Sequence, residues 1–234
     1  FRDANRIRKI VTVFTKYGFG HFFEDVKLHS YLPYVGRQRF MQKVMTMKQS
    51  DAVRLRKAFE ELGPTFIKLG QLLSLRPDLI DEEYCIEFKK LRDDVPSFSF
   101  EKVREIIKKD LKQEMKDIFS LFGEKPIASA SIGQVHEAVL KNGEKVAVKV
   151  QRPDIKESIR DDIDIMYHLA QLFTEHSEIL KNINLEAIIE EFERYTKEEL
   201  DYNVEGRHIS RFYRNFQDDI SVRVPKVYWD YSSK

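Results

Sequence analysis

A β-hairpin pattern near the middle of the chain is the feature that most constrains the fold. Residues 135–140 lead into Asn142-Gly143, and the alternating segment 146–150 leads out of it. Asn-Gly between two strand-like segments is a strong hairpin signal, because both central positions of a type I′ turn need a positive φ. The sequence therefore predicts two antiparallel strands joined by a type I′ turn.

The outgoing strand presents two different faces. Successive side chains of a strand point to opposite sides, so Val146, Val148 and Val150 share one face, and Ala147 and Lys149 share the other. The pattern thus places a lysine beside a small residue, which leaves room for a flat base next to it.

Helical patterns surround the hairpin. Gly63 ends one of them, and Pro64 can open the next because its missing N–H would be unpaired in a first turn anyway. Periodicity predicts helices over 51–62, 64–75, 81–93, 100–112, 114–122, 154–180 and 184–216, and a last strand over 222–229. We therefore expect an α+β fold, with a helical region over 1–122 and a mixed region over 123–234.

Composition excludes several classes of protein. Hydrophobic residues make up 42% and charged residues 34%, which is typical of a globular protein with a core and not of a disordered chain. No apolar stretch reaches the length of a transmembrane helix, and no secretory signal is recognisable. The single cysteine, Cys85, favours a reducing compartment.

Positive charge is concentrated at the start of the chain. Residues 1–50 hold ten basic and three acidic residues, whereas the whole chain has a net charge of +1. This asymmetry favours an anionic partner such as a membrane surface, and a solvated helix face is the alternative. Nucleic acid is not an expected partner, because the region lacks aromatic residues clustered with Lys or Arg.

The segment before the hairpin has the spacing of a phosphate-binding loop, G-x-G-x-x-G-x-V, with alanine in place of the first two glycines. Such a loop lets backbone N–H groups approach nucleotide phosphates, and alanine narrows that approach. A small-residue hairpin without a ligand is the alternative. The candidate nucleotide-binding residues of the loop are Ala128, Ser129, Ala130, Ser131, Ile132, Gly133, Gln134 and Val135.

The strand after the hairpin strengthens the nucleotide interpretation. Its Val146–Lys149 segment matches V-A-[IV]-K, which makes Ala147 and Lys149 candidate ATP-binding residues. A kinase-type lysine needs a carboxylate on the following helix, and Glu205 is the candidate, on a stripe shared with Tyr202 and Ile209. A surface lysine and a partly exposed glutamate are the alternatives. A dinucleotide fold is excluded, because its glycine turn runs from strand into helix.

A polar line follows one face of the otherwise apolar helix over 64–75. It contains Lys68 and Gln71, and Gly70 would let another backbone come close. Glu199 and Asp201 are carboxylates that Lys68 and Gln71 could meet across a shared cleft. The alternative is a stripe that faces solvent. The full line is Thr65, Lys68, Gln71, Ser74 and Asp78.

Together these residues resemble the UbiB/ADCK family of atypical protein-kinase-like proteins. The resemblance covers roughly residues 50–234 and rests on motifs in the family's order. They are Lys68-Leu69-Gly70-Gln71 (K-x-G-Q), Ser74-Leu75-Arg76-Pro77-Asp78, the alanine-rich loop from Ala128, Val146-Ala147-Val148-Lys149, and Glu199-Leu200-Asp201 (E-x-D) followed by Glu205.

The resemblance implies a kinase-like N-lobe preceded by a helical extension, with K-x-G-Q folded over the nucleotide cleft to meet E-x-D. It implies ATP and Mg²⁺ as cofactors, and an atypical kinase or ATPase that supports isoprenoid-quinone biosynthesis. Implied partners are a prenyl-quinone precursor or other lipid, an anionic membrane surface and quinone-biosynthesis enzymes. The implied location is the cytoplasmic side of a membrane, in a bacterium rather than an organelle.

The catalytic half of such a fold is not expected in this chain. No H-x-D-type catalytic loop or D-F-G-type metal aspartate occurs, since the last histidine, His208, is followed by Ile209 and Ser210. We therefore expect no catalytic residue and no metal ligand here, and a chain that stops before the C-lobe. A non-catalytic pseudokinase that binds nucleotide and lipid and organises other enzymes is the alternative function.

Overall fold

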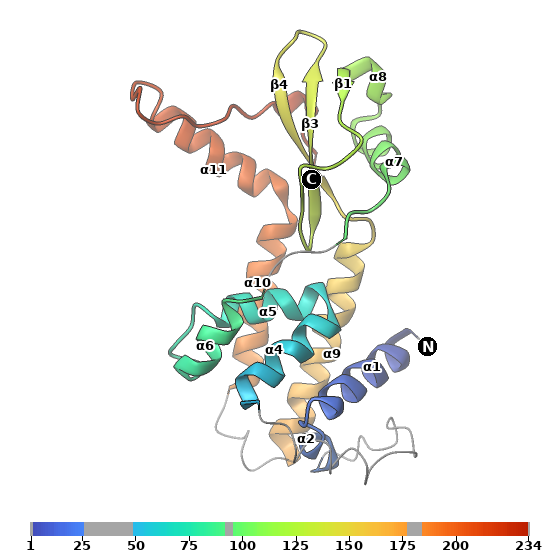
Figure 1. Ribbon diagram of the computed structural model, residues 1–234, viewed down its shortest axis with the longest axis vertical. Helices are drawn as coiled ribbons and strands as arrows, with labels where there is room; N and C mark the ends of the chain where they lie inside the picture. Colours follow the sequence, from blue (N-terminus) through green and yellow to red (C-terminus); the bar gives the residue numbers. More distant parts are fainter. Residues whose placement is uncertain (1, 26–48, 92–95, 177–183, 234) are drawn as a thin grey trace. The chain divides into compact units, whose positions relative to one another are not determined.

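The computed structural model describes residues 2–25, 49–91, 96–176 and 184–233 (Figure 1). They belong to two compact units, one of residues Phe1–Val95 and Lys156–Phe192 and the other of Pro96–Ile155 and Glu193–Lys234. The chain therefore passes from one unit to the other after residues 95, 155 and 192. We call them the helical unit and the sheet unit.

The helical unit contains the helices before residue 95 together with α9 and the first half of α10, and its core includes residues near the amino terminus. Ile10 and Val11 of its first helix are fully buried. Gly63 ends one helix with a φ of 99°, and Pro64 opens the next, as predicted. The helices are α1 (Arg2–Lys16), α2 (His21–Asp25), α4 (Asp51–Leu62), α5 (Pro64–Leu73), α6 (Glu82–Phe88), α9 (Ile155–His176) and the first half of α10 (Leu185–Leu200).

A buried ion pair joins the first helix of this unit to α9. The Arg6 guanidinium donates to both carboxylate oxygens of Asp162, over 2.6 and 2.7 Å, and Asp162 is only 2% exposed. A third bond runs from Arg6 to the carbonyl oxygen of Leu62, 3.1 Å away at the end of α4. One side chain thereby connects three helices that are far apart in sequence.

The sheet unit is built on the predicted hairpin. Strand β3 (Gly133–Leu140) pairs antiparallel with β4 (Lys145–Gln151), and on its other side with β1 (Phe119–Phe122) and the short β2 (Ala128–Ser129). Helices α7 (Phe100–Leu111) and α8 (Met115–Ile118) lie beside this sheet in Figure 1. Helix α11 (Tyr202–Asn215) and a 3-10 turn, η2 (Trp229–Tyr231), complete the described part of the unit.

The core of the sheet unit confirms the two faces predicted for β4. Val150 is buried together with Val103 and Ile107 of α7, and Val146 and Val148 pack against the same cluster. The opposite face of β4 leaves Ala147 and Lys149 exposed. The valines therefore fix the direction in which the lysine points.

The hairpin is confirmed, but its predicted turn type is wrong. Gly143 has a φ of 88°, whereas Asn142 does not have a positive φ. The Gly143 N–H donates to the Leu140 carbonyl over 3.0 Å, and Leu140 N–H donates to Glu144 over 2.9 Å. This is a three-residue loop with a single left-handed glycine, the next most common hairpin after the two-residue type.

Three predicted elements are corrected. The helix predicted over 114–122 ends at Ile118, because residues 119–122 pair with β3 as a strand. The helix predicted over 184–216 is interrupted at Asp201, whose carboxylate accepts from the Asn203 N–H over 3.0 Å and caps α11. The strand predicted over 222–229 is not formed, and η2 occupies its end.

The compact units also divide the chain differently from the predicted boundary after residue 122. Helices α7 and α8 belong to the sheet unit, because Val103, Ile107 and Ile118 are part of its core. Residues 156–192 belong to the helical unit. Over the described ranges, no helix is both long and apolar enough to cross a bilayer.

We predict that Asp162→Asn lowers the free energy of unfolding by about 3 kcal/mol, because it leaves the Arg6 charge without its buried partner. Urea unfolding of the intact protein measures the loss. The matched control is Glu61→Gln, which removes an ion pair to Lys16 whose side chains are 35% and 49% exposed, and it should cost less than about 1 kcal/mol. Equal losses for the two variants would contradict a central role for the Arg6–Asp162 pair.

Candidate nucleotide-binding site

The register of the hairpin places the predicted lysine opposite the end of the predicted loop. Val135, the last residue of that loop, is the cross-strand partner of Lys149. From β4 the lysine Nζ donates to Glu205 Oε2 on α11 over 2.6 Å, so the predicted ion pair is confirmed. The lysine and glutamate side chains are 39% and 50% exposed, and both can therefore be reached by a ligand.

Tyr202 is a member of this site that the sequence did not single out. The Lys149 ammonium lies 4.5 Å from the centre of the Tyr202 ring, which is a cation–π contact. The signal for it was present, since Tyr202 and Glu205 are three residues apart on one helix face. Burial raises the pKa of the Tyr202 hydroxyl above its ordinary value, and the charges of Glu205 and Glu199 add to the shift.

The predicted phosphate loop is a tight turn of the sheet edge. Ala128 and Ser129 form β2, opposite Val135 and Gln134 of β3, and the Ala130 N–H donates to the Gly133 carbonyl over 2.7 Å. Ser131, Ile132 and Gly133 are buried, whereas Ala128 is exposed. In this turn Ala128 is therefore exposed to solvent, whereas Ser131 and Ile132 lie in the interior.

Gly133 is needed for space and not for an unusual backbone conformation. Its φ is not in the left-handed range, but a Cβ added there would lie 2.5 Å from the Tyr202 hydroxyl oxygen and 2.6 Å from the Val150 carbonyl oxygen. The single glycine kept in this loop therefore lets β4 and Tyr202 pack directly against the turn.

A cavity of about 420 Å³ lies along β4 in the sheet unit. Ala147, Lys149, Tyr202 and Glu205 line it, together with α7 and residues 225–233. This volume is within the range of small-molecule sites, and a mostly apolar lining with a few charged groups is typical of them.

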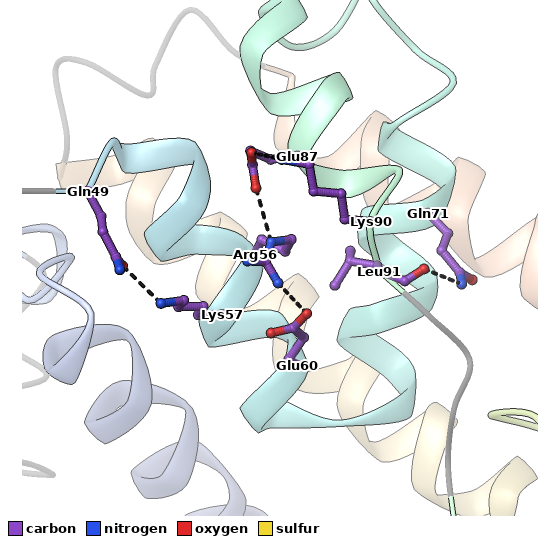
Figure 2. Close-up of polar contacts among 8 residues, drawn as sticks. All are labelled: Gln49, Arg56, Lys57, Glu60, Gln71, Glu87, Lys90 and Leu91. Carbon is purple, nitrogen blue, oxygen red and sulfur yellow. Dashed lines mark hydrogen bonds and ion pairs between the residues drawn. The ribbon is translucent and has the colours of Figure 1, made fainter.

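The K-x-G-Q segment forms part of α5 in the helical unit, and two of its residues have clear structural roles there. A Cβ at Gly70 would lie 2.2 Å from Leu91 Cδ1 and 2.9 Å from Phe59 Cδ2, so glycine permits close packing. The Gln71 amide donates to the Leu91 carbonyl over 3.3 Å, as Figure 2 shows. Both residues therefore hold the segment that follows α6 against α5.

The polar line on α5 does not face solvent. Thr65, Lys68 and Ser74 are 2%, 3% and 7% exposed, so the solvent-facing alternative is wrong for them, whereas the Asp78 side chain at the end of the line is 60% exposed. The Ser74 hydroxyl donates to the Gln71 carbonyl over 2.7 Å. Asp201, the predicted partner in E-x-D, caps α11. A contact of Lys68 and Gln71 with Glu199 and Asp201 stays a prediction.

Ion pairs stabilise the parts of the helical unit around α5, the helix that carries K-x-G-Q. Glu87 on α6 accepts from Arg56 over 3.1 Å and also from Lys90, and these bonds, that to Lys90 foremost, lower the pKa of its carboxyl group (Figure 2). Arg76, in the segment after α5, donates to both carboxylate oxygens of Asp78 and to Glu191 of α10. The segment after K-x-G-Q is thus held by ion pairs within the helical unit.

The described part of the chain contains no group of three or more His, Cys, Asp or Glu side chains that could hold a metal ion. The slim loop, the lysine and its orienting carboxylate fit the part of a nucleotide site that contacts phosphates without a metal ion.

Comparison with known proteins identifies the family. Residues 90–234 match the model of the ABC1 atypical kinase-like domain. Relatives include the probable protein kinase UbiB of Marinobacter nauticus, 40% identical over 80% of this chain and 34% of its own length. The chloroplastic protein activity of bc1 complex kinase 7 of Arabidopsis thaliana is 44% identical over 82% of this chain and 28% of its own length.

A solved structure supports the same fold. The Mycobacterium tuberculosis protein Rv3197, in complex with erythromycin, is 28% identical with a TM-score of 0.53, over 85% of this chain and 49% of its own. The resemblance to the UbiB/ADCK family and the kinase-like α+β fold are thus confirmed. The chain spans about a third of the length of the curated relatives described above.

We predict that Gly133→Ala destabilises the protein by about 1–3 kcal/mol, because a methyl group there must displace a backbone carbonyl as well as the tyrosine. The matched control is Gly143→Asn, because nothing lies within 4 Å of an added Cβ there and its loss reports only the strain of a positive φ, which is smaller for asparagine than for most side chains. Thermal unfolding compares the two variants. A Gly133→Ala protein as stable as Gly143→Asn would contradict the close packing.

We predict that Tyr202→Phe preserves or slightly raises stability at pH 7, because the Tyr202 hydroxyl is buried with no hydrogen-bond partner among the described residues. Because the pKa of the Tyr202 hydroxyl is raised in the folded state, this group contributes stability that is fully present below the ordinary pKa of 10.0. That contribution is lost as pH rises through the pKa of the folded state. The variant should therefore lose less stability than the parent above pH 10.

Urea unfolding at pH 7 and above pH 10 tests this, with Tyr213→Phe as the control because its side chain is 43% exposed. If Tyr202→Phe and Tyr213→Phe change the alkaline loss equally, the environment assigned to Tyr202 is wrong.

Proposed function

Because this chain belongs to the ABC1 atypical kinase-like family, we propose that its sheet unit binds ATP as the nucleotide-binding part of an atypical kinase or ATPase. The observation that carries the proposal is the Lys149–Glu205 pair, 2.6 Å long and placed opposite the end of the alanine loop. An ion pair between a hairpin lysine and a helix carboxylate is the arrangement that positions a lysine over phosphates in protein kinases.

Each residue of the site has a defined part in this proposal. Backbone N–H groups of the Ala128–Val135 loop approach the phosphates, and Lys149 supplies a positive charge that Glu205 orients. The Tyr202 ring limits the movement of the ammonium group from the other side. Ala147, on the same face as Lys149, leaves room for the base. Mg²⁺ neutralises phosphate charge in such sites, and we expect its ligands outside this chain.

The proposal extends to a regulatory cleft. Lys68 of the K-x-G-Q segment is buried, and a buried lysine keeps its charge only with a negative partner nearby. We assign that part to the E-x-D carboxylates Glu199 and Asp201, with Gly70 and Gln71 holding the helix that carries Lys68. In this proposal Lys68 restrains access to the nucleotide and does not take part in phosphoryl transfer.

We also propose the setting of this activity, namely isoprenoid-quinone biosynthesis on the cytoplasmic side of a membrane. Its support is the family resemblance and the relatives named as UbiB kinases, together with the basic first 50 residues. Some of these basic residues already form ion pairs within the protein, since Arg6 is paired with Asp162 and Lys16 with Glu61. Five of the ten, Lys27, Arg37, Arg39, Lys43 and Lys48, lie outside the described residues.

We predict that Lys149→Met weakens ATP binding by the intact protein by about tenfold or more, because it removes a charged contact to the phosphates. Lys145→Met is the matched control, since this lysine is exposed on the same face of β4 and should leave affinity unchanged. Calorimetric titration with ATP gives both affinities, and a thermal melt shows whether the variants are folded.

Two results would contradict the proposal: an intact protein that binds no ATP, or a Lys149→Met variant that binds it as tightly as Lys145→Met. Turnover separates the two candidate functions. ATP hydrolysis or phosphoryl transfer by the parent supports the enzyme, whereas binding without turnover supports the pseudokinase that organises other proteins.

A further inference from the structure

A short segment at the start of the sheet unit, Pro96–Phe98, is attached to the phosphate loop by two side chains. The first is Gln134, which is 1% exposed. Its Oε1 accepts from the Phe98 N–H over 3.0 Å, and its Nε2 donates to the Phe98 carbonyl over 3.3 Å. A side-chain amide thus pairs with both backbone groups of one residue, as a neighbouring strand would.

The second attachment is Arg152, at the end of the hairpin. Its Nη2 donates to the Pro96 carbonyl over 2.9 Å and to the Ala130 carbonyl over 3.4 Å, and its guanidinium lies 5.5 Å from the centre of the Phe98 ring. Its backbone N–H donates to the Ile132 carbonyl over 2.8 Å. Arg152 therefore contacts the loop at two residues and the Pro96–Phe98 segment at two others.

A buried histidine fixes the orientation of Gln134. His136 is fully buried, with Nε2 2.9 Å from Gln134 Nε2 and Nδ1 2.7 Å from the Gly123 carbonyl oxygen. An amide nitrogen can only donate a hydrogen bond, and a carbonyl oxygen can only accept one. The neutral imidazole therefore accepts from Gln134 at Nε2 and donates to Gly123 at Nδ1. This completes the hydrogen bonds of the glutamine amide, so the Gln134 side chain supports the loop from inside and is not directed at a ligand.

We propose that Arg152 and Gln134 are positioning residues, which hold the Ala128–Val135 loop in the shape that receives the phosphates of a nucleotide. This inference rests on the proposed ATP binding and adds two side chains to it that hold the loop and do not themselves touch the ligand. The alanine-rich turn needs such support, because its backbone N–H groups must stay aligned to receive phosphates. The guanidinium gives that support by donating a hydrogen bond to the Ala130 carbonyl. We call the set of Arg152, Gln134, His136 and Phe98 the loop clasp.

The position of the clasp in the chain gives it a second consequence. Pro96 is the first residue of the sheet unit, and Arg152 lies shortly before Lys156, where the chain returns to the helical unit. The clasp thus joins the loop to two of the places at which the covalent chain passes between the units.

The test compares two substitutions of Arg152 in the intact protein. Arg152→Gln removes the charge and the guanidinium, and Arg152→Lys keeps the charge but loses the planar guanidinium, whose Nη2 donates to both carbonyls and which lies over the Phe98 ring. Lys102→Gln is the control, since it removes one positive charge from an exposed ion pair on α7. Calorimetry measures the affinity for ATP and for adenosine, and hydrogen exchange measures the amides of residues 128–135 without any ligand.

We expect Arg152→Gln to bind ATP about tenfold more weakly and adenosine within about twofold of the parent, because only phosphates depend on the loop amides. Arg152→Lys should recover part of the loss, and loop amides should exchange faster in Arg152→Gln than in Lys102→Gln. Equal losses for ATP and adenosine would show a merely structural role and overturn the proposal.

The outcomes also separate this inference from the function on which it rests. An intact protein that binds no ATP contradicts the proposed function. Normal ATP binding and unchanged loop exchange in Arg152→Gln, beside a Lys149→Met variant that has lost affinity, contradict the clasp alone. A Gln134→Met variant provides a second test, because it removes the paired amide without changing charge, and it should also raise exchange at residues 128–135.

Discussion

The pairing register of β3 and β4 is the constraint on which the candidate site depends. It places Val135 opposite Lys149, and a shift by one residue would turn every side chain of β4 to the other face. The valines prevent such a shift, because Val146, Val148 and Val150 would then leave the core they share with α7. The burial of three apolar side chains thus sets the direction of one charged side chain.

The parts of this fold that the sequence predicted are those whose signals are local. The hairpin follows from alternation on both sides of a turn, and the Lys149–Glu205 pair follows from one strand motif and one helical spacing. The strand at residues 119–122 was missed because Phe-Ser-Leu-Phe becomes a strand only by pairing with β3. Sequence periodicity does not contain that partner.

Two further differences between the predicted and the observed elements have other physical causes. The break at Asp201 had a local signal, since aspartate is a preferred N-cap, but no glycine or proline accompanies it. The segment 222–229 has strand-like residues, but a strand needs a partner, and the described residues supply none for it. Site residues such as His136 and Arg152 were missed because their roles depend on contacts with Gly123 and Pro96, which are distant in sequence.

The glycines of the two motifs have the same physical explanation. Gly70 and Gly133 are both required because another group approaches where a Cβ would be, Leu91 in one case and Tyr202 with the Val150 carbonyl in the other. Neither has a left-handed φ. In the Ala128–Val135 loop the third glycine of the motif is thus needed for packing against β4 and Tyr202, while alanine stands at the first two glycine positions.

The polar groups of the sheet unit fall into two sets with different energetic behaviour. Gln134 and His136 are buried with their hydrogen bonds completed, and breaking such a network leaves unpaired groups in a low-dielectric interior. Lys149 and Glu205 are half-exposed, and an ion pair of this kind contributes about 0–1 kcal/mol. The loop is therefore held by bonds that are costly to break, whereas the Lys149–Glu205 pair leaves both of its side chains accessible to a ligand. A rigid loop beside an accessible lysine that its glutamate orients is the combination that the proposed nucleotide binding requires.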